Sequence, residues 1–248
     1  MAEPQPLRHA PITEALVDIR ATPTRPIVSH REAFRDALRD HYPRFKDRHA
    51  FQAQFRFAQG KSPVATASEG GLEGFQFFSS DERSIAQLRS NGFTFNRLSP
   101  YTDGDHLIDE ALRLWEIYRR TARPAGVSRV ALRFINNLTL PTDPGRLGEF
   151  LDSPPTPPPG AGTLLQGFLN RVQSHDPQTG LTVIRTIASA LAKPGAEGLG
   201  VLIDIDAFRS ADLSVEEAEL RPVLAALRTL KNDVFFGSIR DRTVEILN

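Results

Sequence analysis

The chain has 248 residues, of which 40% are hydrophobic and 24% are charged, the composition of an ordinary globular protein. Thirty Lys and Arg balance thirty Asp and Glu, so no net field attracts nucleic acid or a membrane surface, and the lack of cysteine excludes disulfides, thiol nucleophiles and zinc–thiolate sites. Because no apolar run approaches the roughly 18 residues of a membrane helix and the first residues carry no signal-peptide core, we expect a cytoplasmic protein.

Alternation of apolar and polar residues predicts strands through the first hundred residues. Between residues 51 and 57, Phe51, Phe55 and Phe57 fall on one face, while glutamine and arginine occupy the other. This period is typical of a half-buried strand in an antiparallel sheet. Further strands are predicted over residues 14–21, 64–68, 74–79, 84–89 and 92–98, with a turn at residues 90–92.

Two helices interrupt these strands. Ser29 and Glu32 form a capping-box pattern, which predicts a helix from residue 29 to about residue 41. Apolar residues at a 3.6-residue spacing predict a second helix over residues 105–122, with Trp115 and Tyr118 in the core. The predicted core joins several elements: Phe51, Phe55, Phe57, Leu114, Trp115, Val130, Leu132 and Phe134.

The second half of the chain repeats this order. A strand is predicted over residues 129–140, followed by a short helix over 143–151 with Asp143 as its cap. Five prolines within residues 154–159 indicate a stiff connector. Strands are then expected at 164–172, 181–187 and 199–207. A capping box at Ser214 opens a long helix, which Pro222 is expected to kink or divide.

The spacing of corresponding elements indicates an internal duplication. The first strand, first helix cap, second strand and last helix recur at offsets of 114, 114, 113 and 111 residues. We therefore predict an α+β fold in which residues 1–125 and 126–248 are two strand–helix–strands–helix repeats of one compact unit. Together they form a curved antiparallel sheet with the long helices on one face, like the saddle of the TATA-binding protein or a helix-grip fold.

The polar face of this sheet is the first candidate binding site. The expected strands place Arg56, Arg133, Asn137 and Arg185 on one face, and the acidic residues are expected mainly on helices and loops. Such a basic patch binds phosphate, carboxylate, a nucleobase or a partner's backbone. The alternative is an ordinary solvated surface in which these residues pair with Glu14 and Asp18.

Recognisable catalytic and metal-binding patterns are absent from the sequence. The six histidines show no metal-ligand spacing, and His175 lies in an apparent turn. Asp204 and Asp206 are either magnesium ligands on one strand face or an ordinary solvated strand end. With no nucleophile elbow, phosphate loop or dinucleotide fingerprint, we predict no catalytic residue, metal or cofactor.

Two local clusters add candidates. Asn96 and Arg97 lie where a predicted strand leads toward a helix. Asn136 falls on the otherwise apolar face of its strand, and a buried amide needs partners. It is either a clamp on a loop carbonyl or part of a pocket.

Four segments resemble a sporadically distributed family of uncharacterised bacterial proteins of about this length. They are residues 10–16 (APITEAL), 92–101 (GFTFNRLSPY), 114–118 (LWEIY) and 133–137 (RFINN). The resemblance implies a single unit of about 250 residues and supplies no activity, cofactor or catalytic residue. A patchy distribution is typical of mobile accessory functions such as phage defence or toxin–antitoxin modules.

Three functions remain open. The first is a non-enzymatic cytoplasmic module that engages a protein partner, and the absence of a catalytic pattern favours it. The second is a nucleic-acid or nucleotide binder that uses the arginine- and amide-rich face. The third is an enzyme of unrecorded chemistry around Asn96, Arg97, Arg133, Asn136 and His175, since motifs do not transfer between families.

Overall fold

The computed structural model describes residues 5–56, 64–101, 103–156, 167–192, 195 and 197–248. At positions 50–56, 64–69 and 144 it describes the backbone alone. Among the helices in these ranges, none combines the length and the hydrophobicity that crossing a lipid bilayer requires.

The described strands form a single antiparallel sheet in the order β2-β3-β4-β5-β1-β6-β9-β8-β7. The first five strands are β1 (Ile12–Arg20), β2 (Arg44–Arg56), β3 (Val64–Phe78), β4 (Ser84–Arg89) and β5 (Gly92–Leu98). The other four are β6 (Val127–Leu140), β7 (Leu169–His175), β8 (Leu181–Ala190) and β9 (Leu199–Leu213). β1 and β6 pair in the middle, where Val17 lies opposite Leu132. The sequence-based prediction of a large antiparallel sheet is confirmed.

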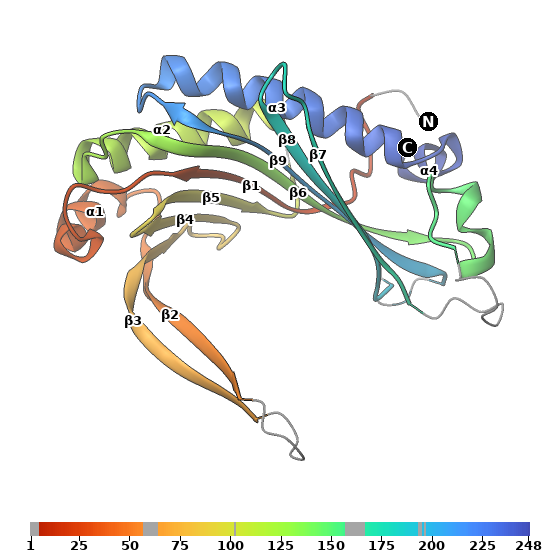
Figure 1. Cartoon of the computed structure of the whole chain (residues 1–248), viewed down its shortest axis with the longest axis horizontal. Helices are drawn as coiled ribbons and strands as arrows, with labels where there is room; N and C mark the ends of the chain where they lie inside the picture. The colour runs from red at the N-terminus through yellow and green to blue at the C-terminus, as the bar shows by residue number, and fades with distance from the viewer. Residues whose placement is uncertain (1–4, 57–63, 102, 157–166, 193–194, 196) are drawn as a thin grey trace.

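Helices cover one face of this sheet. The α-helices are α1 (Arg31–Leu38), α2 (Gly104–Ala122), α3 (Glu217–Ser238) and α4 (Asp241–Leu247), with short 3-10 helices η1 (Ile27–His30) and η2 (Pro144–Glu149). The long helices α2 and α3 lie along the sheet, and the β2–β3 hairpin at one end of the sheet bends away from them (Figure 1). We call the side beneath α2 and α3 the helix-covered face and the other side the open face.

The core fills the space between the sheet and the long helices. Trp115 and Tyr118 of α2 are fully buried and stack with ring centroids 5.4 Å apart, and Phe93 of β5 packs against both. The Trp115 indole N–H donates a hydrogen bond to the Val215 carbonyl, 100 residues away, at 2.9 Å. The predicted core residues Leu114, Trp115, Val130, Leu132 and Phe134 all belong to this one cluster. The side chains of Phe51 and Phe55, and all of Phe57, lie outside the described residues.

Several predicted boundaries shift. β2 begins at Arg44, and β3 runs unbroken where two strands were expected. The Ser29 capping box is wrong, because the Ser29 hydroxyl donates to the Pro26 carbonyl and the α-helix begins at Arg31. The Ser214 capping box is also wrong, because the N-cap of α3 is Glu216, without a side-chain cap bond, and the Ser214 hydroxyl accepts a hydrogen bond from the Glu216 N–H before the helix begins. Pro222 lies in the second turn of α3, and the helix continues through it.

Candidate functional site

Arginines and aspartates alternate across neighbouring strands on the open face. Asp18 of β1 is 8% exposed and accepts a hydrogen bond from the Arg89 guanidinium of β4 at 2.8 Å. Arg129 of β6 donates to both carboxylate oxygens of Asp206 of β9 and lies 4.3 Å above the ring of Phe208. Burial raises the pKa of Asp206 above its usual range, while the charge of Arg129 acts in the opposite direction.

The same pattern holds Arg133, the central sequence-based candidate. Its guanidinium forms a two-pronged ion pair with Asp204, with N–O distances of 2.8 and 2.6 Å. This hydrogen bonding raises the pKa of Arg133 above its usual value. Nearby, the Asn96 amide donates to Glu14 at 2.5 Å and accepts from Gln87 at 2.8 Å.

The structure separates the six predicted binding residues. Arg133, Asn137 and Asn96 lie on the open face, while only the backbone of Arg56 is described. Arg97 and Arg185 lie on the helix-covered face, because they pair with Ala15 and Ile205, whose side chains point into the core. Arg97 donates to the Ser84 hydroxyl at 2.9 Å, and Arg185 reaches the Ser238 hydroxyl at 3.5 Å.

The predicted basic patch on the sheet is therefore wrong in two respects. Arg185 does not converge with Arg133, because neighbouring residues of a strand point to opposite faces and Ile184 and Thr186 occupy the open face of β8. The expectation that acidic residues lie mainly on helices and loops also fails here. Strand carboxylates neutralise Arg89, Arg129 and Arg133, so these arginines do not form an unshielded anion site.

A cavity of about 740 Å³ lies on the other side of the sheet, beside the start of α2. We call it the Lys231 cavity. Residues 5–12, Ser99, Pro100, Tyr101, Asp103, Gly104, Asn136, Arg228, Lys231, Asn232, Phe235 and Phe236 line it. Three of the four segments that carry the family resemblance meet there, through residues 10–12, Pro100 with Tyr101, and Asn136. Segments that are far apart in the sequence thus line this cavity together with α3.

Lys231 is the chemically distinctive group of this cavity. Its ammonium lies 4.0 Å from the centre of the Phe134 ring, and Tyr101 packs edge-on against the same ring at 5.4 Å. Burial, followed by the charge of Arg228, lowers the pKa of Lys231 to about 8. In the described part of the chain, no carboxylate lies within ion-pair distance of Lys231.

Arg228 supplies a second cation on the same wall. It lies one helical turn before Lys231 on α3 and donates to the Asp105 carboxylate at 2.5 Å. The exposed Asp105 side chain leaves this pair open to solvent. Gly104 allows the close approach of α2, since a Cβ there would lie 2.6 Å from the Arg228 Nε.

Asn136 serves as a clamp and also lines the cavity. Its side-chain N–H donates to the Ile203 carbonyl of β9 at 3.0 Å, and the residue is 3% exposed. The predicted clamp on a loop carbonyl is wrong in its partner, because the carbonyl belongs to strand β9, and the alternative, a residue that lines a pocket, describes Asn136 as well.

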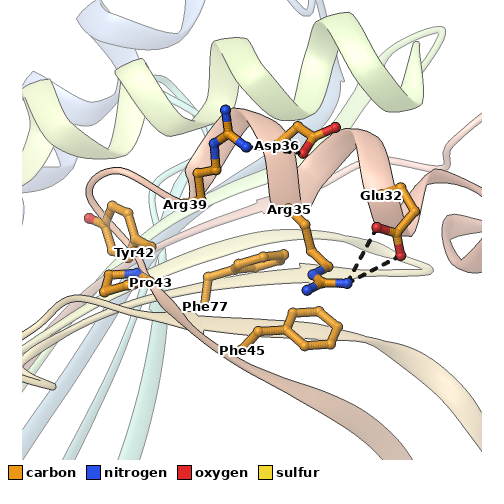
Figure 2. A pocket seen from close by; sticks show the side chains of 8 residues that line it. All are labelled: Glu32, Arg35, Asp36, Arg39, Tyr42, Pro43, Phe45 and Phe77. Atoms are coloured by element: carbon orange, nitrogen blue, oxygen red, sulfur yellow. Dashed lines mark hydrogen bonds and ion pairs between the residues drawn. The ribbon is translucent and has the colours of Figure 1, made fainter.

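The smaller cavities are weaker candidates for a binding site than the Lys231 cavity. One of about 220 Å³ lies beneath α1, where Phe45 and Phe77 pack with ring centroids 5.0 Å apart (Figure 2). Arg35 points over Phe45 and is paired with Glu32 (Figure 2). Another of about 310 Å³ contains His175, whose Nδ1 lies 2.9 Å from the Thr182 hydroxyl. In the ranges that the structure describes, no three His, Asp or Glu side chains cluster closely enough to share a metal ion.

Comparisons with protein-family models, curated proteins and solved structures gave no match to this chain. The family resemblance therefore stays a prediction, and the site has to be argued from its geometry.

The sequence did contain a signal for the site that we missed. Buried residues recur along α3 at Leu220, Leu224, Leu227 and Phe235, and Lys231 occupies the next position of the same stripe. Burying the ammonium of a lysine on an apolar helix face costs free energy of folding unless the charge is paired. An unpaired lysine at such a position is therefore a candidate functional residue.

Proposed function

We propose that this protein is a cytoplasmic binding module that takes a small organic anion, or the anionic end of a partner, into the Lys231 cavity. The observation that carries this proposal is the presence of two cations on one cavity wall, of which Lys231 has no carboxylate partner in the described chain. A cavity of about 740 Å³ lies within the size range of small-molecule sites, roughly 300–1,000 Å³.

The walls favour a ligand with both an apolar body and a negative group. Pro100, Tyr101, Phe235 and Phe236 supply apolar surface, and aromatic rings bind flat or aliphatic groups well. The cations lie together on α3, so they would hold a carboxylate or phosphate at one end of the ligand. This division between an apolar wall and a polar end orients the ligand.

The partner that we favour is a protein, whose chain-terminal or side-chain carboxylate would enter the cavity. A free carboxylate compound shares that chemistry, and the test below separates the two sources. An accessory role in phage defence or a toxin–antitoxin system stays an association from the family resemblance. The paired arginines of the open face speak against the nucleic-acid alternative, because their carboxylate partners are at most 24% exposed, whereas the Asp105 partner of Arg228 is 79% exposed and leaves that arginine open to a ligand.

Replacing Lys231 by methionine should weaken the binding of phenyl phosphate and benzoate about tenfold or more, since a charge-assisted hydrogen bond contributes about 1.5–3 kcal/mol. The measurement is isothermal titration calorimetry on the full chain. Lys46→Met is the matched control, because the Lys46 ammonium also lies on a ring, 5.2 Å from the centre of Phe78, but outside the cavity.

Peptides with a free or an amidated C-terminus distinguish the sources of the carboxylate. Preference for the free peptide over benzoate supports a protein partner, whereas tighter binding of benzoate supports a small compound. Equal affinities of wild type and Lys231→Met for all these probes would overturn the proposed function.

We also propose that residues 1–125 and 126–248 are two copies of one strand–helix–strands–helix unit in a TATA-binding-protein-like or helix-grip-like saddle. The strand order supports this proposal. β1 and β6, the first strands of the two units, pair at the centre, and the last strands β5 and β9 flank them on either side. β4 and β8 follow outward in the same sequence, and a long helix, α2 or α3, comes after each set of strands.

A further inference from the structure

The amine of Lys231 has an environment that differs from that of an ordinary surface lysine. It lies on the wall of a cavity large enough for a small compound, against the Phe134 ring, and without an ion-pair partner in the described chain. A cation on the same helix, Arg228, lies one turn away. A buried amine with a nearby cation holds its proton weakly, which makes its lone pair more available.

We propose that Lys231 captures a carbonyl compound, of the 2-oxo acid class, as a reversible imine. This inference rests on the proposed anion site, takes the free carboxylate compound as its ligand in place of a protein carboxylate, and names the reactive group of that compound. The neutral amine attacks the carbonyl carbon to give a carbinolamine, which loses water as the C=N bond forms. Amine and carbonyl thus give imine and one water, with no oxidant or reductant, and hydrolysis reverses the step.

The arrangement of the two cations explains the choice of a 2-oxo acid. Arg228 and Lys231 are three residues apart on α3, so their side chains emerge on neighbouring positions of one helix face. In a 2-oxo acid the carboxylate carbon is bonded directly to the carbonyl carbon. Arg228 can therefore hold the carboxylate while Lys231 approaches the carbonyl carbon, and the apolar walls receive the rest of the compound.

Arg228 is the charged group that acts on the amine, and other titratable groups line the same cavity. Arg228 lies on its own helix, Arg8 and His9 come from the N-terminal segment, and Tyr101 and Asp103 precede α2. Burial raises the pKa of Tyr101 and keeps its hydroxyl neutral. Asp103 already accepts a hydrogen bond from the His106 backbone N–H at 2.7 Å. Asp105, which is paired with Arg228, adds a second carboxylate, so the two arginines are matched by two aspartates, and burial together with the neighbouring Arg228 favours the neutral amine.

The test is reductive trapping of the full chain with pyruvate and sodium cyanoborohydride, followed by peptide mapping. The chain has four lysines, Lys46, Lys61, Lys193 and Lys231, so labelling can be compared at every one. We expect Lys231 to be modified at least tenfold faster than each of the other three. Arg228→Met should slow that labelling while leaving labelling of Lys46 unchanged.

Labelling at equal rates across the four lysines would overturn the imine, and this readout needs no variant that must fold. Phenyl phosphate serves as the competitor. If it binds wild type but no Lys231 adduct forms, the imine fails and the proposed function stands. If the Lys231 adduct forms and phenyl phosphate neither binds nor protects, the imine stands and the anion site fails.

Discussion

Replacing Trp115 by alanine should lower the free energy of unfolding by about 3–5 kcal/mol, a large part of the stability of a typical domain. The side chain is fully buried between Phe93 and Tyr118, so its removal leaves a cavity that these rings fill only in part. The change also removes the hydrogen bond to the Val215 carbonyl, which ties α2 to the segment before α3. That carbonyl would then lack its indole donor.

Urea unfolding followed by circular dichroism measures this effect. Leu169→Ala is the control, since Leu169 on the edge strand β7 is 73% exposed and its loss should change stability by less than about 0.5 kcal/mol. Similar midpoints for Trp115→Ala and wild type would contradict the described core.

Replacing Asp18 by alanine should lower the free energy of unfolding by about 3 kcal/mol. The variant leaves charged arginine partners in a poorly solvated place without the Asp18 carboxylate. The Asp18 and Arg89 side chains are only 11% and 18% exposed, and Arg129 lies 3.9 Å from the same carboxylate. Loss of Asp18 would leave the Arg89 guanidinium without its nearest carboxylate. Arg129 keeps its bond to Asp206, so the effect should fall mainly on Arg89.

The control for Asp18→Ala is a solvent-exposed ion pair between an arginine and a carboxylate. Glu32→Ala removes the partner of Arg35 on α1, where both side chains are more than half exposed, and should cost less than about 0.5 kcal/mol. Chemical unfolding at neutral pH gives both values. Equal small losses in the two variants would show that the open face is an ordinary solvated surface.

Local patterns predicted the strands well, because burial on one side imposes a two-residue period on each strand. β4 and β5 were predicted to the residue, and β6 nearly so. The pairing of charges could not be predicted in the same way. Asp204 meets Arg133, and Asp206 meets Arg129, because β9 lies next to β6, and that neighbourhood depends on strand order. A sequence read one strand at a time gives the arginines without their partners.

The assignment of Arg185 shows a second limit. In β8 apolar residues occur at positions of both parities, with Val183 and Ile187 toward the helices and Ile184 on the open face. The pattern therefore did not decide which face Arg185 shares. Pairing with Ile205 of β9 decides it, since paired residues project to one side.

The Lys231 cavity required tertiary structure for another reason. Its walls come from the N-terminal segment, the approach to α2, β6 and α3, and the first and last lining residues, Gln5 and Phe236, are 231 positions apart in the sequence. Asn136 and Tyr101 belong to segments that the sequence singled out, yet nothing local indicated that they share a cavity with Lys231. Only the place of Lys231 on the buried stripe of α3 pointed to an unusual lysine.

The most direct test of the account is the titration of the four lysines in protein labelled with ¹³C and ¹⁵N at lysine, followed by NMR. Burial and the nearby charge of Arg228 disfavour the ammonium form, so one lysine signal should titrate near pH 8. That signal should disappear in Lys231→Met and remain in Lys46→Met. A Lys231 signal that titrates at the ordinary value of about 10.5 would contradict the account, because the amine would then be solvated or paired with a carboxylate.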